Sequence, residues 1–319
     1  MTGVWLWIGF GVFIGGMLAV DLGLVNRKAH VISVREAARW TAVVVSMAAL
    51  FNLWIFTARG SDAGLEFLTG YVIELALSVD NIFVFLLIFS YFKVPRQYQH
   101  RVLFWGILGA LLMRGGMIAA GWLLLERFSW ITYLFGAFLI FTGIRTGIHQ
   151  DIDIEPESNP FLKLIRRFIP VSTEYEGQRF FVRAEDGERR RVVATPMLVV
   201  LVMVETTDLI FAVDSIPAVF AITRDPFIVF TSNVFAILGL RSMYFLLAGS
   251  VDKFHFLKLG MAAVLTFVGT KMVATYFDVH VPIGISLGIV GLILATSVAA
   301  SLMFPQAAQT HSSGDHERP

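Results

Sequence analysis

The feature that most limits how this chain can fold is a series of apolar segments, most of them about 20 residues long. A helix of that length crosses the hydrocarbon core of a bilayer. Nine spans are predicted, near 4–25, 38–57, 66–92, 102–124, 130–148, 196–222, 229–249, 257–277 and 281–304. Composition agrees, since 56% of the residues are hydrophobic, 15% are charged and the mean hydropathy is +0.73. The predicted fold class is an all-α, polytopic integral membrane protein embedded in a lipid bilayer.

The positive charges between the spans predict an orientation. Loops at one side are rich in Lys and Arg, whereas the loops at the other side hold little beyond Arg59, Arg127 and Arg224. The positive-inside rule then places the N-terminus outside and the C-terminus in the cytoplasm. Arg27 and Lys28 follow the first span instead of preceding it, which favours an uncleaved anchor over a signal peptide.

Two of the apolar segments contain the same acidic motif. In each copy an acid stands six residues before an Asp, and an amide or a hydroxyl follows at once; a fifth acid precedes the second copy. A charged residue at the centre of a spanning helix costs about 2.5–3.5 kcal/mol, so five acids cost roughly 12–17 kcal/mol. Such a cost predicts something that stabilises negative charge, and a bound cation is the simplest candidate. The candidate metal-binding residues are Glu74, Asp80, Asn81, Glu205, Asp208, Asp214 and Ser215.

The repetition extends beyond these acids. Residues 136–145 align with 262–271, and each copy also has a mid-span arginine, Arg114 or Arg241. Each unit is therefore three spans, and an odd number of spans predicts that the two copies are inverted, as in many secondary transporters. The predicted organisation is two N-terminal helices (1–60), a first repeat (61–148), a cytoplasmic loop (149–195), a second, inverted repeat (196–277), a final helix (278–304) and a disordered tail (305–319).

The loop at 149–195 contains two recognisable patterns. Residues 161–169 alternate apolar and basic side chains at helical spacing, which predicts a short helix on the anionic inner leaflet. Residues 179–195 read as a hairpin with a turn at Asp186 and Gly187. We interpret the loop as a connector that carries topology signals, with a regulatory domain as the alternative.

The metal-binding atoms that the chain offers limit which ion it can bind. Carboxylate, amide, hydroxyl and carbonyl oxygens suit hard cations such as Mn²⁺, Mg²⁺ or Ca²⁺. Zinc and copper prefer thiolate, imidazole or thioether ligands, but the chain has no cysteine and its histidines lie near span ends. Nothing in the sequence indicates nucleic-acid binding or a particular oligomeric state.

Helical geometry separates the acids of the second motif. Glu205 and Asp208 are one turn apart, while Asp214 would point away from Glu205 on a straight helix. Pro217 disrupts the hydrogen bond to the carbonyl of Val213, so we expect a local break that turns Asp214 inward.

The two arginines have two interpretations. Arg114 and Arg241 either form structural ion pairs with acids of neighbouring helices or compete with the metal, holding the acids when the site is empty.

These motifs, at 67–81, 204–217 and 231–249, resemble the TerC family of integral membrane proteins, and most closely its Alx-type manganese exporters. The resemblance implies a multi-pass protein of the bacterial inner membrane with manganese efflux as its activity. By motif position it implies the seven candidate residues as the site.

The preferred function is a secondary transporter that exports a divalent cation, with manganese as the expected ion, and neither an enzyme nor a protein with a resident cofactor. Moving a divalent cation outward against about 100 mV costs roughly 4.6 kcal/mol. Since no nucleotide-binding motif is present, proton antiport through the acids is the expected coupling. The alternatives are an exporter of tellurite, another oxyanion or a small solute, and a non-transporting membrane scaffold that serves a stress response.

Overall fold

The computed structural model describes residues 3–20, 32–148, 162–163, 167, 169–172, 174–186, 189–248 and 254–304. Within them the chain is almost entirely helical. The helices are α1 (Val4–Val20), α2 (Val34–Arg59), α3 (Ser61–Tyr91), α4 (Arg96–Arg127), α5 (Ile131–Ile148), α7 (Pro196–Phe220), α8 (Pro226–Leu247), α9 (His255–Ala274), the short 3-10 helix η4 (Thr275–Phe277) and α10 (Ile283–Met303).

Eight of these described helices are long and apolar enough to cross a membrane, and α1 is a shorter apolar helix. Each one overlaps a segment predicted from the sequence, so the all-α, polytopic fold class is confirmed.

Local sequence signals explain where several of the helices begin and end. Ser33 caps α2, and Asp225 caps α8 by accepting hydrogen bonds from the first backbone amides of that helix. Gly60, with φ of +96°, allows the chain to reverse between α2 and α3.

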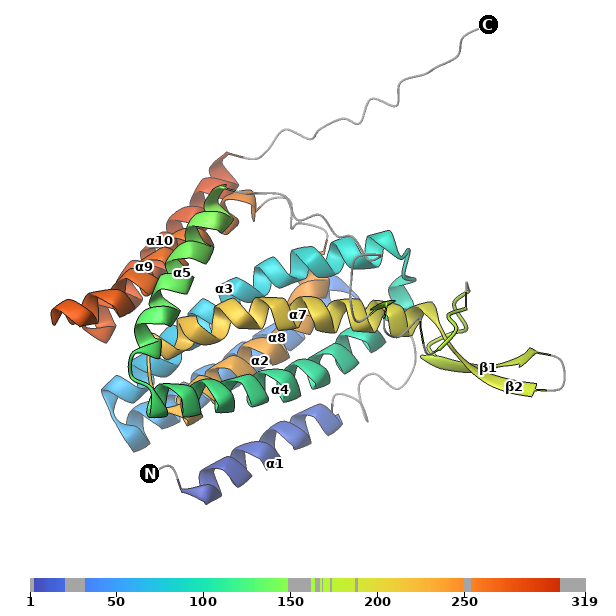
Figure 1. The fold of residues 1–319 in the computed structure, drawn as a ribbon, viewed down its shortest axis with the longest axis horizontal. Coiled ribbons are helices and arrows are strands. Elements are labelled where there is room, and N and C mark those ends of the chain that lie inside the picture. The colour runs from blue at the N-terminus through green and yellow to red at the C-terminus, as the bar shows by residue number, and fades with distance from the viewer. Residues whose placement is uncertain are drawn as a thin grey trace, which may run out of the picture.

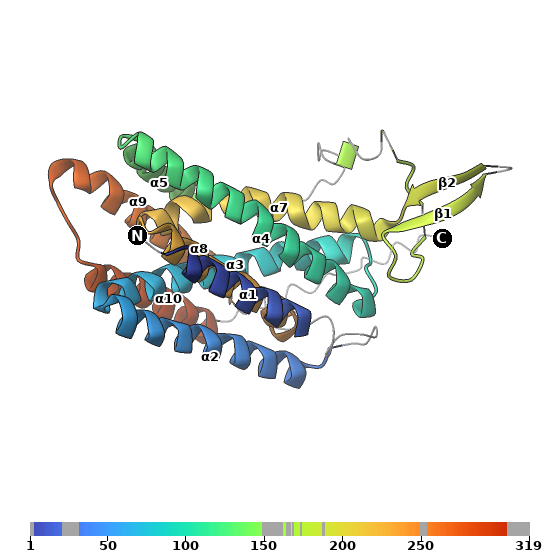
Figure 2. The same cartoon turned by 90° about the horizontal axis from the view of Figure 1, so that it is seen from below.

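The helices with the acidic motifs, α3 and α7, pack against each other. α3 packs against α2, α7 and α8, and α4 packs against α7 and α8. Figures 1 and 2 show α1 on the outside of this group. The helices α5, α9 and α10 form a second group, which crosses the first one steeply in Figure 1.

The packing pairs connect the two predicted repeats. α3 packs on α8 while α4 packs on α7, and the third helices of the two units, α5 and α9, pack on each other. Two three-helix units related by a two-fold axis would give these reciprocal pairs. The inverted relation itself stays a prediction.

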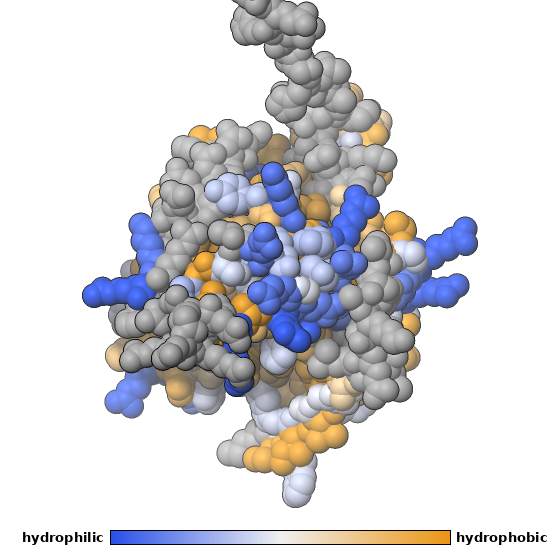
Figure 3. Space-filling model, turned by 90° about the vertical axis from the view of Figure 1, so that its right-hand side faces the viewer, coloured by the Kyte–Doolittle hydropathy of each residue, from blue (hydrophilic) through white to orange (hydrophobic). Residues whose placement is uncertain are grey.

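The predicted hairpin is present before α7. β1 (Phe181–Asp186) pairs antiparallel with β2 (Arg189–Ala194), with Phe181 opposite Ala194 and Asp186 opposite Arg189. It extends past the end of α7 (Figures 1 and 2), and hydrophilic side chains gather at this end of the molecule in Figure 3. The hydroxyl of Tyr175 donates to the carbonyl of Phe92 at 2.8 Å, which fastens this segment to the end of α3. The predicted helix at 161–169 and the tail at 305–319 lie largely or wholly outside the described residues.

Glycines allow α5 and α9 to approach very closely. A Cβ atom added at Gly136 would lie 2.9 Å from the carbonyl oxygen of Gly269, and one at Gly143 would lie 2.8 Å from that of Ala262. Small residues at such crossings are the usual way in which membrane helices gain packing without a hydrophobic driving force. The α5–α9 pair is therefore a closely fitted unit.

This crossing yields a stability prediction. In Gly269→Ala the new Cβ would lie 2.6 Å from the oxygen of Gly136 and 2.9 Å from the nitrogen of Ile140, so two backbones must separate. We expect the free energy of unfolding in detergent to fall by about 1–3 kcal/mol. The matched control is Gly116→Ala in α4, where no atom lies within 4 Å of the added Cβ. Equal stability of the two variants would show that the close crossing does not hold α5 to α9.

Candidate functional site

A buried arginine joins three helices at the centre of the molecule. Arg114 of α4 is only 2% exposed. Its Nε and Nη2 atoms donate to the two carboxylate oxygens of Asp208 in α7, at 3.1 and 2.9 Å. Its Nη1 atom forms an ion pair with Glu74 of α3 and donates to the hydroxyl of Ser215 at 3.3 Å. The planar guanidinium matches the carboxylate of Asp208 with two parallel hydrogen bonds, a geometry that lysine cannot reproduce.

Asn81 completes this centre from α3. It lies seven residues after Glu74 and therefore on the same helical face, and its Nδ2 atom is 3.5 Å from Oδ1 of Asp208. Glu74, Asn81, Asp208 and Ser215 are all buried. Four of the seven predicted site residues are thus brought together around Arg114. We call Arg114 with these four residues the Arg114 centre.

Glu205 lies one turn before Asp208 on α7, within electrostatic range of it. Its carboxylate packs against Gly109 of α4, where an added Cβ would lie 2.6 Å from Oε2 of Glu205. Among the described residues, this Oε2 atom and Oε2 of Glu74 have no hydrogen-bond partner. Two buried carboxylate oxygens therefore remain able to accept a bond from a ligand.

The charges in this region do not balance when the acids are ionised. One guanidinium faces the carboxylates of Glu74 and Asp208, and the carboxylate of Glu205 lies close by. Excess negative charge in a low-dielectric interior is unfavourable unless protons or a cation neutralise it. Carboxylate, amide and hydroxyl oxygens are also the donors that hard cations prefer. The centre is chemically suited to a hard cation or to protons.

The structure places the second acid of each motif elsewhere. Asp80 lies within electrostatic range of Lys258 in α9, and Asp214 lies near Thr142 and Arg145 in α5. Both acids thus face the α5–α9 pair. Among the described residues, no three His, Asp or Glu side chains are grouped so that they could hold a metal. A metal site shared by all seven candidates therefore stays a prediction.

The expected break at Pro217 is absent. α7 runs without interruption from Pro196 to Phe220, with Pro217 inside it. Pro217 removes only the bond to the Val213 carbonyl, and the amide of Ala221 bonds to the carbonyl of Pro217 at 3.0 Å. The final turn of the helix therefore continues, and Asp214 keeps the direction that a straight helix gives it.

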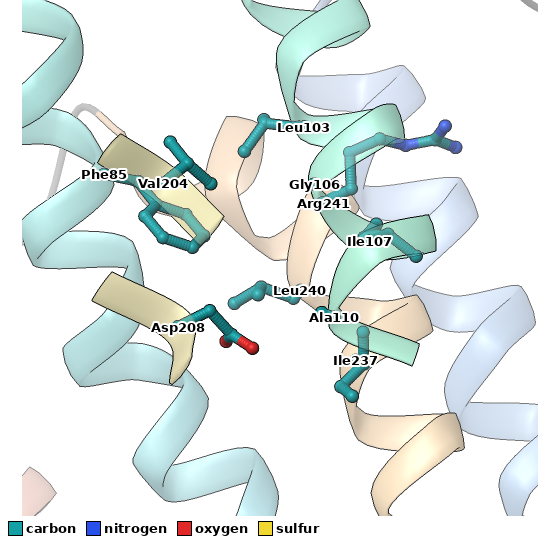
Figure 4. A pocket seen from close by; sticks show the side chains of 10 residues that line it. All are labelled: Phe85, Leu103, Gly106, Ile107, Ala110, Val204, Asp208, Ile237, Leu240 and Arg241. Carbon is teal, nitrogen blue, oxygen red and sulfur yellow. The ribbon is translucent and has the colours of Figure 1, made fainter. Parts of the chain in front are cut away.

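The two arginines have different surroundings, although the sequence presents them as equivalents. Arg114 forms the expected ion pairs with acids of neighbouring helices. Figure 4 shows the guanidinium of Arg241 directed away from Asp208. A cavity of about 10 Å³, enough for roughly one water molecule, lies between Asp208 and Phe85. A second small cavity beside Arg241 is lined by residues of α1 and α2, among them Met17 and Trp40.

Sequence reasoning missed several residues that shape this region. Gly109 makes room for Glu205, and Thr142 lies near Asp214. Tyr71 and Ser78 of α3 are buried on the face that also carries Glu74 and Asn81. The spacing 71, 74, 78 and 81 repeats every three or four residues, and this regular pattern could have identified them.

These observations define a class of protein: a polytopic integral membrane protein with a buried ionic centre shared by three helices. The chain belongs to the TerC family of integral membrane proteins, whose sequence model matches residues 59–309.

The relatives are similar over nearly their whole length. A Myxococcus xanthus protein called "Uncharacterized membrane protein STKORF319" is 51% identical over 96% of this chain and 94% of its own length. An Escherichia coli (strain K12) protein called "Putative membrane-bound redox modulator Alx" is 45% identical over 92% of this chain and 93% of its own. An uncharacterized membrane protein of Rickettsia bellii is 39% identical over 93% of this chain and 97% of its own. No solved structure matches the chain.

The ion pairs of Arg114 predict a large effect on stability. In Arg114→Met the unbranched apolar part of the side chain is kept, but the carboxylates of Glu74 and Asp208 lose their buried counter-charge. We expect unfolding in detergent to become easier by about 3–5 kcal/mol. The control is Arg127→Met at the exposed end of α4, which should unfold like the parent protein. An Arg114→Met protein as stable as this control would contradict a role for the ion pairs in the fold.

Proposed function

We propose that the protein is a secondary transporter that exports a divalent metal cation in exchange for protons, and that manganese is its physiological ion. The observation that carries the proposal is a group of three carboxylates, those of Glu74, Asp208 and Glu205, of which only Glu74 and Asp208 are paired with the guanidinium of Arg114. A purely structural polar network needs only balanced charges. A site that loads and unloads a cation needs carboxylates beyond those that the protein itself neutralises.

Arg114 is the internal competitor of the ion in this proposal. Its guanidinium occupies both carboxylate oxygens of Asp208 and reaches Glu74, which are the groups that a cation would use. A cation therefore binds only when Arg114 moves away from at least one of them. Protons act in the opposite direction, because a protonated carboxylic acid holds a metal ion poorly. Competition between metal, guanidinium and protons for the same oxygens gives exchange a physical basis.

The ligand types support manganese as the cargo. The centre offers carboxylate, amide and hydroxyl oxygens, and the chain contains no cysteine that could supply a soft thiolate. Asp80 and Asp214 remain in the proposal as acids that join the site only if α3 and α7 move relative to the α5–α9 pair. The predicted orientation, with the C-terminus in the cytoplasm, and a place in the bacterial inner membrane belong to the same proposal.

The name of the Escherichia coli relative describes a redox modulator. A chain without cysteine has no thiol with which to perform redox chemistry of its own. Manganese is a redox-active metal, so a protein that sets its concentration would alter the redox state of a cell without carrying a redox group. Metal export is thus compatible with the name of that relative.

The first functional prediction concerns the acids of the centre. Glu74→Gln and Asp208→Asn keep the side-chain shape but remove a negative charge, so each should lower manganese affinity in the purified protein at least about tenfold, which is 1.4 kcal/mol. Both should also abolish protection of manganese-sensitive cells, measured as manganese accumulation. Glu126→Gln, at the exposed end of α4, is the control. Affinity and protection equal to the control in both variants would remove the centre from the proposal.

The second functional prediction concerns coupling. Proteoliposomes loaded with manganese should release it faster when an inward proton gradient is imposed, because entering protons replace the ion on the carboxylates. A protonophore should abolish this acceleration. Asp208→Asn liposomes are the control for leakage. Release that is independent of both the gradient and the protonophore would rule out antiport and favour a uniporter or a channel.

A further inference from the structure

One face of α3 carries a row of buried residues with aromatic rings at both ends and polar groups between them. Every third or fourth residue of α3 contributes to the row, and each is at most 7% exposed. In order they are Phe67, Tyr71, Glu74, Ser78, Asn81 and Phe85. We call the four polar residues of this row, at 71, 74, 78 and 81, the polar seam. The seam covers about 15 Å along the helix, half the thickness of a bilayer core.

The polar seam contains hydrogen-bonding atoms that the protein does not use. Among the described residues, the hydroxyls of Tyr71 and Ser78 and Oε2 of Glu74 have no partner. The same is true of Nδ2 of Asn233 in α8, the helix against which α3 packs most extensively within its group. A buried polar atom without a partner costs about 1–3 kcal/mol, so a row of them in one membrane helix requires an explanation. Water or a hydrated ion passing along the row would satisfy these atoms.

Aromatic packing closes the seam at the end near the start of α3. Phe67 stacks on Tyr71, with ring centroids 6.2 Å apart and an angle of 5° between the rings. Phe67 also contacts the rings of Phe51 and Phe235. The rings around Phe67 therefore close the seam at this end.

Phe85 closes the opposite end. It lines the cavity of about 10 Å³ that also touches Asp208, and the carboxylate of Asp208 points into this space in Figure 4. The rest of the lining is largely aliphatic, including Leu103, Ile107 and Leu240. The cavity therefore connects the Arg114 centre to Phe85 but has room for about one water molecule only.

We propose that the polar seam of α3 is the path by which a hydrated cation reaches the Arg114 centre, and that Phe67 and Phe85 are hydrophobic plugs that close it at opposite ends. Apolar constrictions stop ions because they exclude water, and they open when the rings move aside. With both plugs in place the structure is occluded, and opening one plug at a time gives access to alternate sides. The identity of the ion that uses the path rests on the proposed transport function, whereas the location of the path does not.

The absence of cysteine makes a direct test possible, because one introduced thiol is then the only target of a thiol reagent. The reporter is Ser78→Cys, in the middle of the seam. The probe is a cationic, membrane-impermeant methanethiosulfonate, applied to sealed vesicles of either orientation without manganese. Adding Phe85→Ala should raise the modification rate at least about tenfold from the side of the β1–β2 hairpin only. Adding Phe67→Ala should do so from the opposite side only.

Two controls separate a path from general loosening. Ile73→Cys is on α3 but off the seam and is fully buried in an apolar cluster, so its modification should stay slow in both plug backgrounds. Phe220→Ala removes a buried ring away from the seam and should not expose Ser78→Cys. If an alanine variant does not reach the membrane, leucine at the same position makes a smaller opening with the same expected sidedness.

The outcomes are separable from those of the manganese experiments. Modification of Ser78→Cys no faster than that of Ile73→Cys, or from the same side in both plug variants, would overturn the proposed path. Sided modification in a protein that neither binds nor exports manganese would keep the path and reject manganese as its cargo.

Discussion

The ion pairs of Arg114 are the interaction on which the rest of the structure depends. An arginine or a carboxylate alone at membrane depth is costly, and the three side chains become tolerable only together. Because the bidentate contact with Asp208 has a narrow geometry, it fixes α7 relative to α4. The ion pair with Glu74 holds α3 to the same arginine. The position of Gly109 follows from the same constraint, since α4 must leave room for the carboxylate of Glu205.

The acids of each motif connect this centre to the second group of helices. On both α3 and α7 the first acid of the motif pairs with Arg114. The second acid lies near a basic side chain of the other group, Lys258 of α9 or Arg145 of α5. The α5–α9 pair is itself held by close glycine contacts, whereas its contacts with α3 and α7 are few. The second acids therefore lie at the boundary between the two groups of helices, whereas the first acids lie within one group.

The sequence predicted the spans, the hairpin and the acids that lie inside the spans because these signals are local. Apolar length, turn residues and the cost of a charge in a membrane can be read along one chain. It did not separate Arg114 from Arg241, or Asp208 from Asp214, because their partners depend on how helices rotate against one another. The break at Pro217 failed for a related reason: a proline near the end of a helix removes one hydrogen bond, and the surrounding packing keeps the turn in place.

A polar path across a membrane must not leak, and two features of the structure would act as barriers in the proposed path. Phe67 and Phe85 exclude water from the ends of the seam, and the aromatic cluster around Phe67 recovers packing energy that the unpartnered polar atoms lose. Arg114 supplies the second barrier, because a cation that passes one plug meets a fixed positive charge already holding Asp208. In the proposed transport, entry requires an exchange of partners at the centre, and an ion that cannot displace the guanidinium is turned back. The arginine that makes the buried acids tolerable would then also make passage selective for cations that bind carboxylates strongly.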